Sequence, residues 1–292
     1  MSNKIAHNMT NNLESTTRQI IRYTPESQAS DQDSLAVEEP LEIRVRSRSI
    51  SVTMRTPGPI ENDAELAVGF LLTEGMIHHS GDVLKTEPGG NRELGNVINV
   101  FLDPGVTIDF DQMTRHVFTS SSCGLCGKAT IDAVLHQFDP IEINSHTGPA
   151  VHSDIILALP DRLRIRQQTF DRTGGLHAAG IFDLEGNLIV LREDIGRHNA
   201  VDKVIGYGLL HDLLPFDRHI LMVSGRSSFE IIQKALAARL AIITAVSAPS
   251  SLAVDFASQS NQTLIGFLRN NRMNIYTHPQ RLKFKTKHDV PH

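Results

Sequence analysis

The chain has 292 residues, of which 40% are hydrophobic, and it carries a formal net charge of −5. This length allows one large domain or two smaller ones with a real hydrophobic core. The negative charge gives no overall basic field, and Trp is absent, so we expect no nucleic-acid partner. No segment approaches about 18 unbroken apolar residues and no apolar export signal is visible, so we expect a cytoplasmic protein without a membrane span.

The N-terminal part of the chain changes character near Pro40. Residues 1–38 are rich in Asn, Ser, Thr and Gln, which predicts a flexible leader. From Pro40 to Met54, apolar residues alternate with polar ones at the strand period, which predicts a hairpin.

A helix is predicted next, from Asn62 to a stop at Gly75, with Glu65 as a capping-box partner. A further strand is expected from Val97. These elements predict a small N-terminal α+β domain over residues 39–112.

The only two cysteines, Cys123 and Cys126, lie three positions apart in a segment rich in Ser and Gly. The apolar spacing of Ala129–Phe138 predicts a helix with Ser122 as its N-cap. The thiols would then lie at the first helical turn, where unpaired N–H groups, the helix dipole and Lys128 favour an anion. We therefore expect one thiol to be substantially ionised at neutral pH.

Such a pair can exchange disulfides, form half of a zinc site or carry a reactive sulfur. Zinc needs four ligands, and the glutamate-containing motif of the zinc deaminases is absent, so we expect no bound metal. On the residues alone, a dithiol–disulfide oxidoreductase remains the alternative to a sulfur carrier.

Between the cysteines and the C-terminal half, a helix is predicted near residues 153–168 and is expected to be interrupted or kinked at Pro160. A hairpin with its tip at residues 185–187 follows. His177 and His198 lie in glycine-flanked, polar surroundings, and either form part of a site or cap loops.

From His219 onward, strands alternate with helices, which predicts a largely parallel sheet covered on both faces. We expect this α/β domain over residues 113–282, with a tail over 283–292. Polar loops follow three strands, and ligands bind at this edge of such sheets.

Those three loops suit a phosphate-bearing ligand. Two of them, Ser224–Ser228 and Ser247–Ser251, lead into helix N-termini. Gly225 opens the backbone of the first loop, and positive charge comes from Arg226 there and from Arg269 and Arg272 in the third.

Seven segments in order show that the chain resembles the formate dehydrogenase accessory sulfurtransferase family, FdhD. They are Leu66–Gly75, Ser121–Gly127, Thr173–Gly180, Arg192–Gly206, Ser224–Ala235, Ser247–Val254 and Gly266–Leu282. Ser250 stands where much of the family has Thr, which keeps the hydroxyl.

The resemblance implies a three-layer α/β/α, cytidine-deaminase-like domain with a smaller N-terminal domain, in a homodimer. It implies that sulfur passes from a cysteine desulfurase to the molybdenum (or tungsten) bis-molybdopterin guanine dinucleotide cofactor before that cofactor enters formate dehydrogenase. Cys123 would bear the persulfide, with Cys126 as its partner. The cofactor-binding residues would be Phe267, Leu268, Arg269, Asn270, Asn271 and Arg272. A chaperone that only holds the cofactor is a further alternative.

Overall fold

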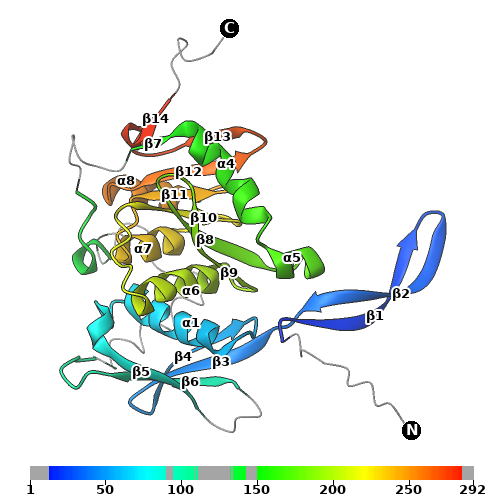
Figure 1. Ribbon diagram of the computed structural model, residues 1–292, viewed down its shortest axis with the longest axis horizontal. Coiled ribbons are helices and arrows are strands. Elements are labelled where there is room, and N and C mark those ends of the chain that lie inside the picture. The colour runs from blue at the N-terminus through cyan, green and yellow to red at the C-terminus, as the bar shows by residue number, and fades with distance from the viewer. Residues whose placement is uncertain are drawn as a thin grey trace, which may run out of the picture.

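The structure is a computed structural model that describes residues 13–89, 95–108, 110, 132, 134–142 and 150–284. Its layers follow one another from the bottom to the top of Figure 1: a four-stranded sheet, the helices α1 and α6, a six-stranded sheet, and α4. None of the helices in these ranges is long and apolar enough to cross a membrane. The mixed α/β class is confirmed, whereas the cytidine-deaminase-like layering stays a prediction.

A two-stranded hairpin forms where we predicted a flexible leader. β1 (Ser15–Thr24) and β2 (Ser27–Ala36) pair antiparallel along their whole length. Thr, Ile and Tyr favour strands, and this preference prevails over the polar composition. The prediction of a leader was therefore wrong for residues 15–36.

The four-stranded sheet has the order β4-β3-β6-β5. Its strands are β3 (Glu39–Val45), β4 (Arg48–Arg55), β5 (Val83–Pro88) and β6 (Val97–Leu102), with the short 3₁₀ helix η1 (Ser80–Asp82) before β5. The predicted hairpin and third strand are thus confirmed. Alternate residues of β3, from Leu41 to Val45, are fully buried beneath α1 (Ile60–Thr73). That helix begins two residues before Asn62, and no side chain caps its N-terminus.

The six-stranded sheet has the order β13-β12-β11-β10-β8-β9. Its strands are β8 (His177–Asp183), β9 (Leu188–Asp194), β10 (His219–Val223), β11 (Ile242–Ala245), β12 (Thr263–Arg269) and β13 (Arg272–Ile275). β10, β11 and β12 pair parallel, whereas β8 pairs antiparallel with β10 and β9, and β13 pairs antiparallel with β12. The predicted hairpin around residues 185–187 is confirmed as β8 and β9, and the prediction of a largely parallel sheet after His219 was wrong for β13.

Helices lie on both faces of this sheet (Figure 1). They are α4 (Ser153–Arg164), α5 (Gln168–Thr173), α6 (Arg197–Leu210), α7 (Phe229–Ala237) and α8 (Ser251–Gln259). Pro160 lies inside α4 and does not interrupt it, so of the two expected outcomes the interruption was wrong. A 3₁₀ turn, η2 (Pro279–Arg281), leads into β14 (Leu282–Lys283), which pairs with β7 (Val151–His152).

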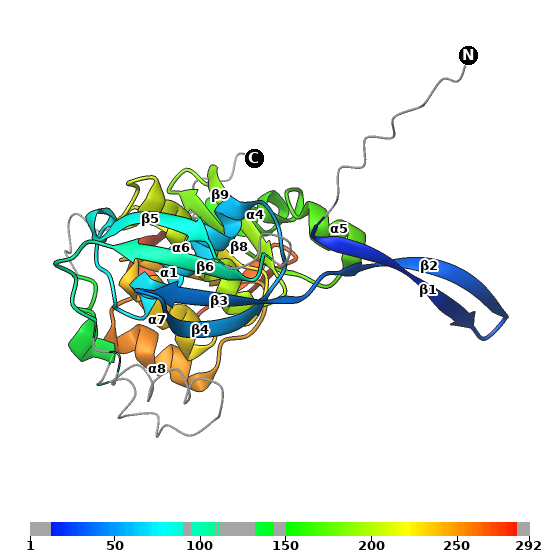
Figure 2. The ribbon, with the colours of Figure 1, turned by 90° about the horizontal axis from the view of Figure 1, so that it is seen from below.

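The two sheets are joined through a close contact between α1 and α6. A Cβ atom added at Gly206 would lie 1.8 Å from the backbone oxygen of Glu65, and one added at Gly69 would lie 1.9 Å from that of Asp202. Only glycine permits this distance between the two backbones. Seen from below in Figure 2, the four-stranded sheet covers α1 and α6.

Candidate functional site

The candidate site lies along one edge of the six-stranded sheet. Because β10, β11 and β12 are parallel, their carboxyl ends meet at the same edge. His177 begins β8, which runs antiparallel to β10, so it lies at that edge as well. Ser228 and Ser250 follow there as the N-cap residues of α7 and α8.

Backbone hydrogen bonds connect the three loops into one surface. The amide of Ser250 donates to the oxygen of Ser227 at 3.0 Å, and the amide of Phe267 donates to that of Ser247, also at 3.0 Å. The Ser250 hydroxyl accepts from the amide of Ala253 at 3.2 Å and caps α8. The two helix N-termini therefore lie side by side and present unpaired N–H groups together.

A tight turn joins β12 to β13 at the end of this surface. Asn270 and Asn271 both have positive φ, at 52° and 54°, as a two-residue hairpin turn requires. Arg269 and Arg272 lie directly opposite each other across the turn, and both are exposed. Like charges in this position destabilise a hairpin, so the pair favours a bound anion.

His177 sits among cations at the other end of the edge. Its imidazole is half-buried, and a Cβ atom at Gly225 would lie 3.2 Å from His177 Nδ1. Burial lowers the pKa of His177, and the charges of Arg197, His198 and Arg226 lower it further. The ring is therefore held neutral beside fixed positive charge, which an anionic ligand would offset.

His198, which follows the first residue of α6, is held by two groups of the α7 N-terminus. Its Nε2 lies 3.0 Å from Ser228 Oγ and 2.9 Å from Glu230 Oε2. This hydrogen bond lowers the pKa of Glu230, against the opposing effect of burial. His198 thus links α6 to α7, which matches the loop-capping alternative.

Two buried polar atoms at this edge have no hydrogen-bond partner within the described ranges, Ser227 Oγ and Arg197 Nε. Ser227 is 0% exposed. Buried groups of this kind usually have partners, and their absence is typical of a binding site. Unpaired N–H groups, cations and an unpartnered hydroxyl together fit the phosphate groups of a nucleotide.

The predicted binding residues divide into two groups. Six of them lie at the edge: Gly225 lines it, and five are exposed there, namely Arg226, Arg269, Asn270, Asn271 and Arg272. Phe267 is half-buried, and its ring centroid lies 5.8 Å from the Arg269 guanidinium. Leu268 is 0% exposed, so its side chain belongs to the core.

The two cysteines, Cys123 and Cys126, lie outside the described residues. The end of the helix predicted after them is described, and residues 134–137 are helical. Val134 packs into the core, and Gln137 Nε2 donates to the backbone oxygen of Glu74 at 2.8 Å. In the ranges that the structure covers, no group of three or more His, Cys, Asp or Glu side chains could hold a metal ion.

A family model described as the FdhD/NarQ family matches residues 36–283. The chain belongs to this family. It is 49% identical over 260 residues to a protein of Mycobacterium tuberculosis named "Sulfur carrier protein FdhD", covering 86% of this chain and 92% of that one. A Sulfolobus acidocaldarius protein of the same name is 42% identical over 254 residues, covering 87% and 93%.

The fold of this FdhD/NarQ chain is similar to a crystal structure of "a putative formate dehydrogenase accessory protein" from Desulfotalea psychrophila. The TM-score is 0.72 at 23% sequence identity, covering 92% of this chain and 99% of that one. The resemblance identified from the sequence is thereby confirmed.

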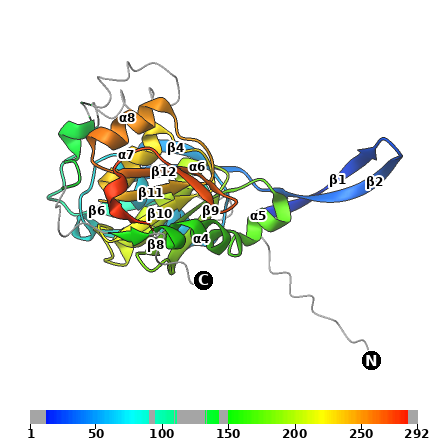
Figure 3. The same cartoon turned by 90° about the horizontal axis from the view of Figure 1, so that it is seen from above.

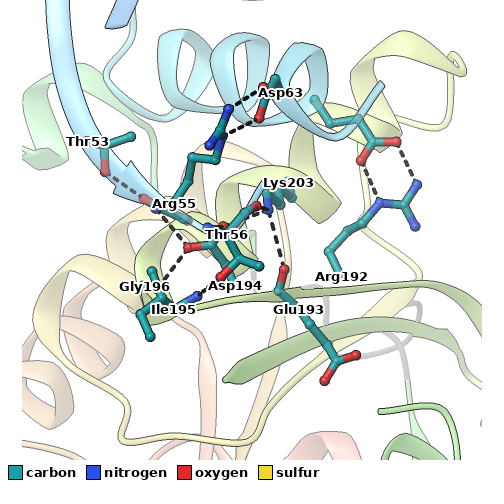
Figure 4. A network of polar contacts seen from close by, with 12 residues as sticks. Thr53, Arg55, Thr56, Asp63, Arg192, Glu193, Asp194, Ile195, Gly196 and Lys203 are labelled. Carbon is teal, nitrogen blue, oxygen red and sulfur yellow. Dashed lines mark hydrogen bonds and ion pairs between the residues drawn. The ribbon is translucent and has the colours of Figure 1, made fainter. Parts of the chain in front are cut away.

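The charged run of this FdhD/NarQ chain, from Arg192 to His198, divides between structure and site, and Figure 4 shows its first part, from Arg192 to Gly196. Arg192 forms a bidentate pair with Glu65 of α1, at 2.6 Å for both bonds. Asp194 is 0% exposed and accepts from Lys203 Nζ at 2.6 Å. These residues fix the N-terminal sheet to the main sheet, whereas Arg197 and His198 face the candidate site.

Two residues at the site, Arg197 and Glu230, were not predicted, and Ser228 was predicted as part of its loop but not as a partner of His198. Arg197 follows Gly196 at the start of α6, and a basic residue next to a glycine at a helix start was the available signal. Ser228 and Glu230 carry no sequence signal beyond ordinary helix capping, because their contacts with His198 span 30 and 32 positions of the chain.

Proposed function

We propose that this protein is a sulfurtransferase that works through a cysteine persulfide. Cys123 takes sulfur from a cysteine desulfurase and passes it to molybdenum (or tungsten) bis-molybdopterin guanine dinucleotide before that cofactor enters formate dehydrogenase. The site at the sheet edge carries the proposal, because its helix N-termini, cations and unpartnered Ser227 hydroxyl suit the diphosphate of a guanine dinucleotide. The names of the relatives support the sulfur-carrier role.

The sulfur chemistry follows from thiolate exchange. The Cys123 thiolate attacks the outer sulfur of the desulfurase persulfide, which transfers that sulfur and releases the desulfurase thiolate, with no net oxidation. Attack of the Cys126 thiolate on the Cys123 sulfur then releases hydrosulfide to the metal and leaves a disulfide. A cellular dithiol reduces this disulfide with two electrons and restores both thiols.

Intact-mass spectrometry after incubation with a cysteine desulfurase and cysteine tests the sulfur step. We expect the gain of one sulfur atom, removed by reductant and absent in Cys123→Ala. A dithiol oxidoreductase would form the disulfide without retaining sulfur, and a cofactor-holding chaperone would support formate dehydrogenase maturation without either cysteine. Full maturation in cells carrying Cys123→Ala would contradict the proposal.

Calorimetry with GDP tests the binding site separately. The double variant Arg269→Ala, Arg272→Ala should weaken binding by roughly tenfold or more, because two charge-assisted contacts are lost. Arg164→Ala with Arg172→Ala is the matched control, since it removes the same charge from exposed positions on α4 and α5. Equal GDP affinity in both double variants would exclude the β12–β13 turn from the site.

A further inference from the structure

The candidate site has two groups of positive charge, one at each end of the sheet edge. Seen from above in Figure 3, β12, β11, β10 and β8 follow one another across the sheet. Three strand spacings of about 4.8 Å separate β8 from β12, so the start of β8 lies roughly 14 Å from the β12–β13 turn. The group around His177, which begins β8, can therefore contact a different part of a large ligand from the turn.

The strand pairing and the loop after β10 fix the position of His177. The amide of Ala178 donates to Ser224 Oγ at 2.9 Å, and the amide of Ser224 donates to the backbone oxygen of Ala178, also at 2.9 Å. Gly225 follows in this loop, and a Cβ atom there would lie 3.2 Å from His177 Nδ1 and 3.9 Å from Arg197 Cβ. Because Gly225 has no side chain, one small group of a ligand can approach the imidazole and the loop backbone together.

Positive charge reaches His177 from two neighbouring elements. Arg197 and His198 begin α6, and Arg226 lies in the loop between β10 and α7. Burial lowers the pKa of His177 most, and each of these three charges lowers it further. The imidazole is therefore neutral at neutral pH, and within the described ranges it makes no hydrogen bond.

The carboxylates near His177 already have partners. Asp194 lies opposite His177 on β9 and accepts from Lys203 Nζ at 2.6 Å. Glu230 of α7 lies 2.9 Å from His198 Nε2. Neither carboxylate is left to balance the positive charge beside the imidazole, so a bound anion would be its partner.

We propose that His177 is a ligand-binding residue that takes up a proton from solvent when a phosphate group of the ligand binds at this end of the edge. An anion placed beside Arg197 and Arg226 offsets the repulsion that keeps the imidazole neutral. The imidazolium then donates a charge-assisted hydrogen bond to a phosphate oxygen. Only a proton moves, from water to the ring, and no bond of the phosphate changes. The proposal rests on the proposed function, because the ligand is taken to be the diphosphate of a guanine dinucleotide.

This proton makes binding depend on pH in one direction. Because the ring is neutral in the free protein and charged in the complex, affinity is highest at acid pH and falls as the pH rises, until the ring is neutral in both states. A hydrogen bond from a charged donor contributes strongly to binding. We therefore expect the affinity to fall by roughly tenfold or more between about pH 5.5 and about pH 8.

Calorimetry with GDP-mannose measures the proton. The diphosphate of GDP-mannose is esterified at both ends, as in a dinucleotide, so it has no terminal phosphate that titrates near pH 6. Titrations at about pH 6.5, in two buffers with different ionisation enthalpies, give the number of protons taken up. We expect net uptake by the wild-type chain and none by His177→Gln, whose affinity should no longer fall as the pH rises.

Two further variants separate the possible results. His211→Gln is the matched control and should keep the wild-type uptake, because this exposed histidine lies at the other end of α6. Loss of uptake in His198→Gln but not in His177→Gln would overturn the proposal. Binding of GDP-mannose by the wild-type chain without uptake would also overturn it and would leave the proposed function intact. Absence of binding at every pH would instead refute the diphosphate site, and both proposals with it.

Proton NMR follows the ring itself. The resonance of the His177 ring, identified by its absence from the spectrum of His177→Gln, should titrate at higher pH in the complex than in the free protein. A midpoint that GDP-mannose leaves unchanged would contradict the uptake of a proton at this residue.

Discussion

Replacing Lys203 by methionine would show how much the buried ion pair of Figure 4, which joins α6 to β9 of the main sheet, contributes to stability. The Lys203 side chain is 1% exposed and its Nζ lies 2.6 Å from Asp194 Oδ2, on a side chain that is 0% exposed. Methionine keeps the length of the side chain and removes the charge. Asp194 would retain N–H donors from Thr56, Gly196 and Asn199 but would lose its counter-charge.

The cost follows from leaving one buried charge uncompensated, which destabilises a protein by about 3–5 kcal/mol. For 292 residues the unfolding entropy is roughly 0.6 kcal/mol per degree, so a loss of this size lowers Tm by about 5–8 °C. Calorimetry would measure the change in Tm, and urea unfolding would measure the change in free energy.

Lys85→Met is the matched control for this prediction. Lys85 lies 2.7 Å from Glu87, but both side chains are about half exposed, so its loss should cost less than about 1 kcal/mol. A double variant, Lys203→Met with Asp194→Asn, should recover part of the stability because no buried charge remains. If Lys203→Met were no more destabilising than Lys85→Met, the buried pair would contribute no more to stability than an exposed one.

Three further predictions concern the helix contact and the candidate site. Gly206→Ala should lower the unfolding free energy, measured by urea titration, by about 3 kcal/mol or more, because the added Cβ would lie 1.8 Å from a backbone oxygen. Gly175→Ala is the control and should have little effect, because the nearest atom to its added Cβ would lie 3.5 Å away. The pKa of His177 is lowered in the folded state, so the contribution of His177 to stability is complete above the ordinary pKa of 6.5 and is lost as the pH falls below that value. His177→Gln should therefore make the unfolding free energy depend less on pH on the acid side. An unchanged pH dependence would count against a lowered pKa of His177. Ser227→Ala should leave Tm unchanged or slightly raised, because no hydrogen bond is lost, yet weaken GDP binding measured by calorimetry; unaltered affinity would remove Ser227 from the site.

Periodic hydrophobic patterns allowed most helices and strands to be predicted from the sequence. The polar composition of residues 15–36 concealed the β1–β2 hairpin, since its strands are stabilised by pairing with each other and bury almost nothing. The direction of β13 was also missed. Buried strands have similar local patterns whether their neighbours are parallel or antiparallel, and long-range pairing decides between them.

The position of the loops follows from the sequence, whereas the contacts that support them do not. Loops that follow parallel strands lie at one sheet edge, and the structure places Arg226 and Arg269 together at that edge. The pair between Glu65 and Arg192 spans 127 positions of the chain, and no local pattern indicates it. Leu268 is one of the binding residues that the resemblance implies, but its side chain lies in the core because strand residues alternate between the two faces.

The glycine contact between α1 and α6 restricts how this protein can admit a large ligand. Two backbones that touch at Gly69 and Gly206 leave no layer of side chains that could slide, so a hinge opening between the two sheets would have to break the contact completely. The body therefore behaves as one rigid block. Under the proposed function, a bulky dinucleotide would reach the sheet edge directly from solvent, and the loops that border that edge would select among ligands.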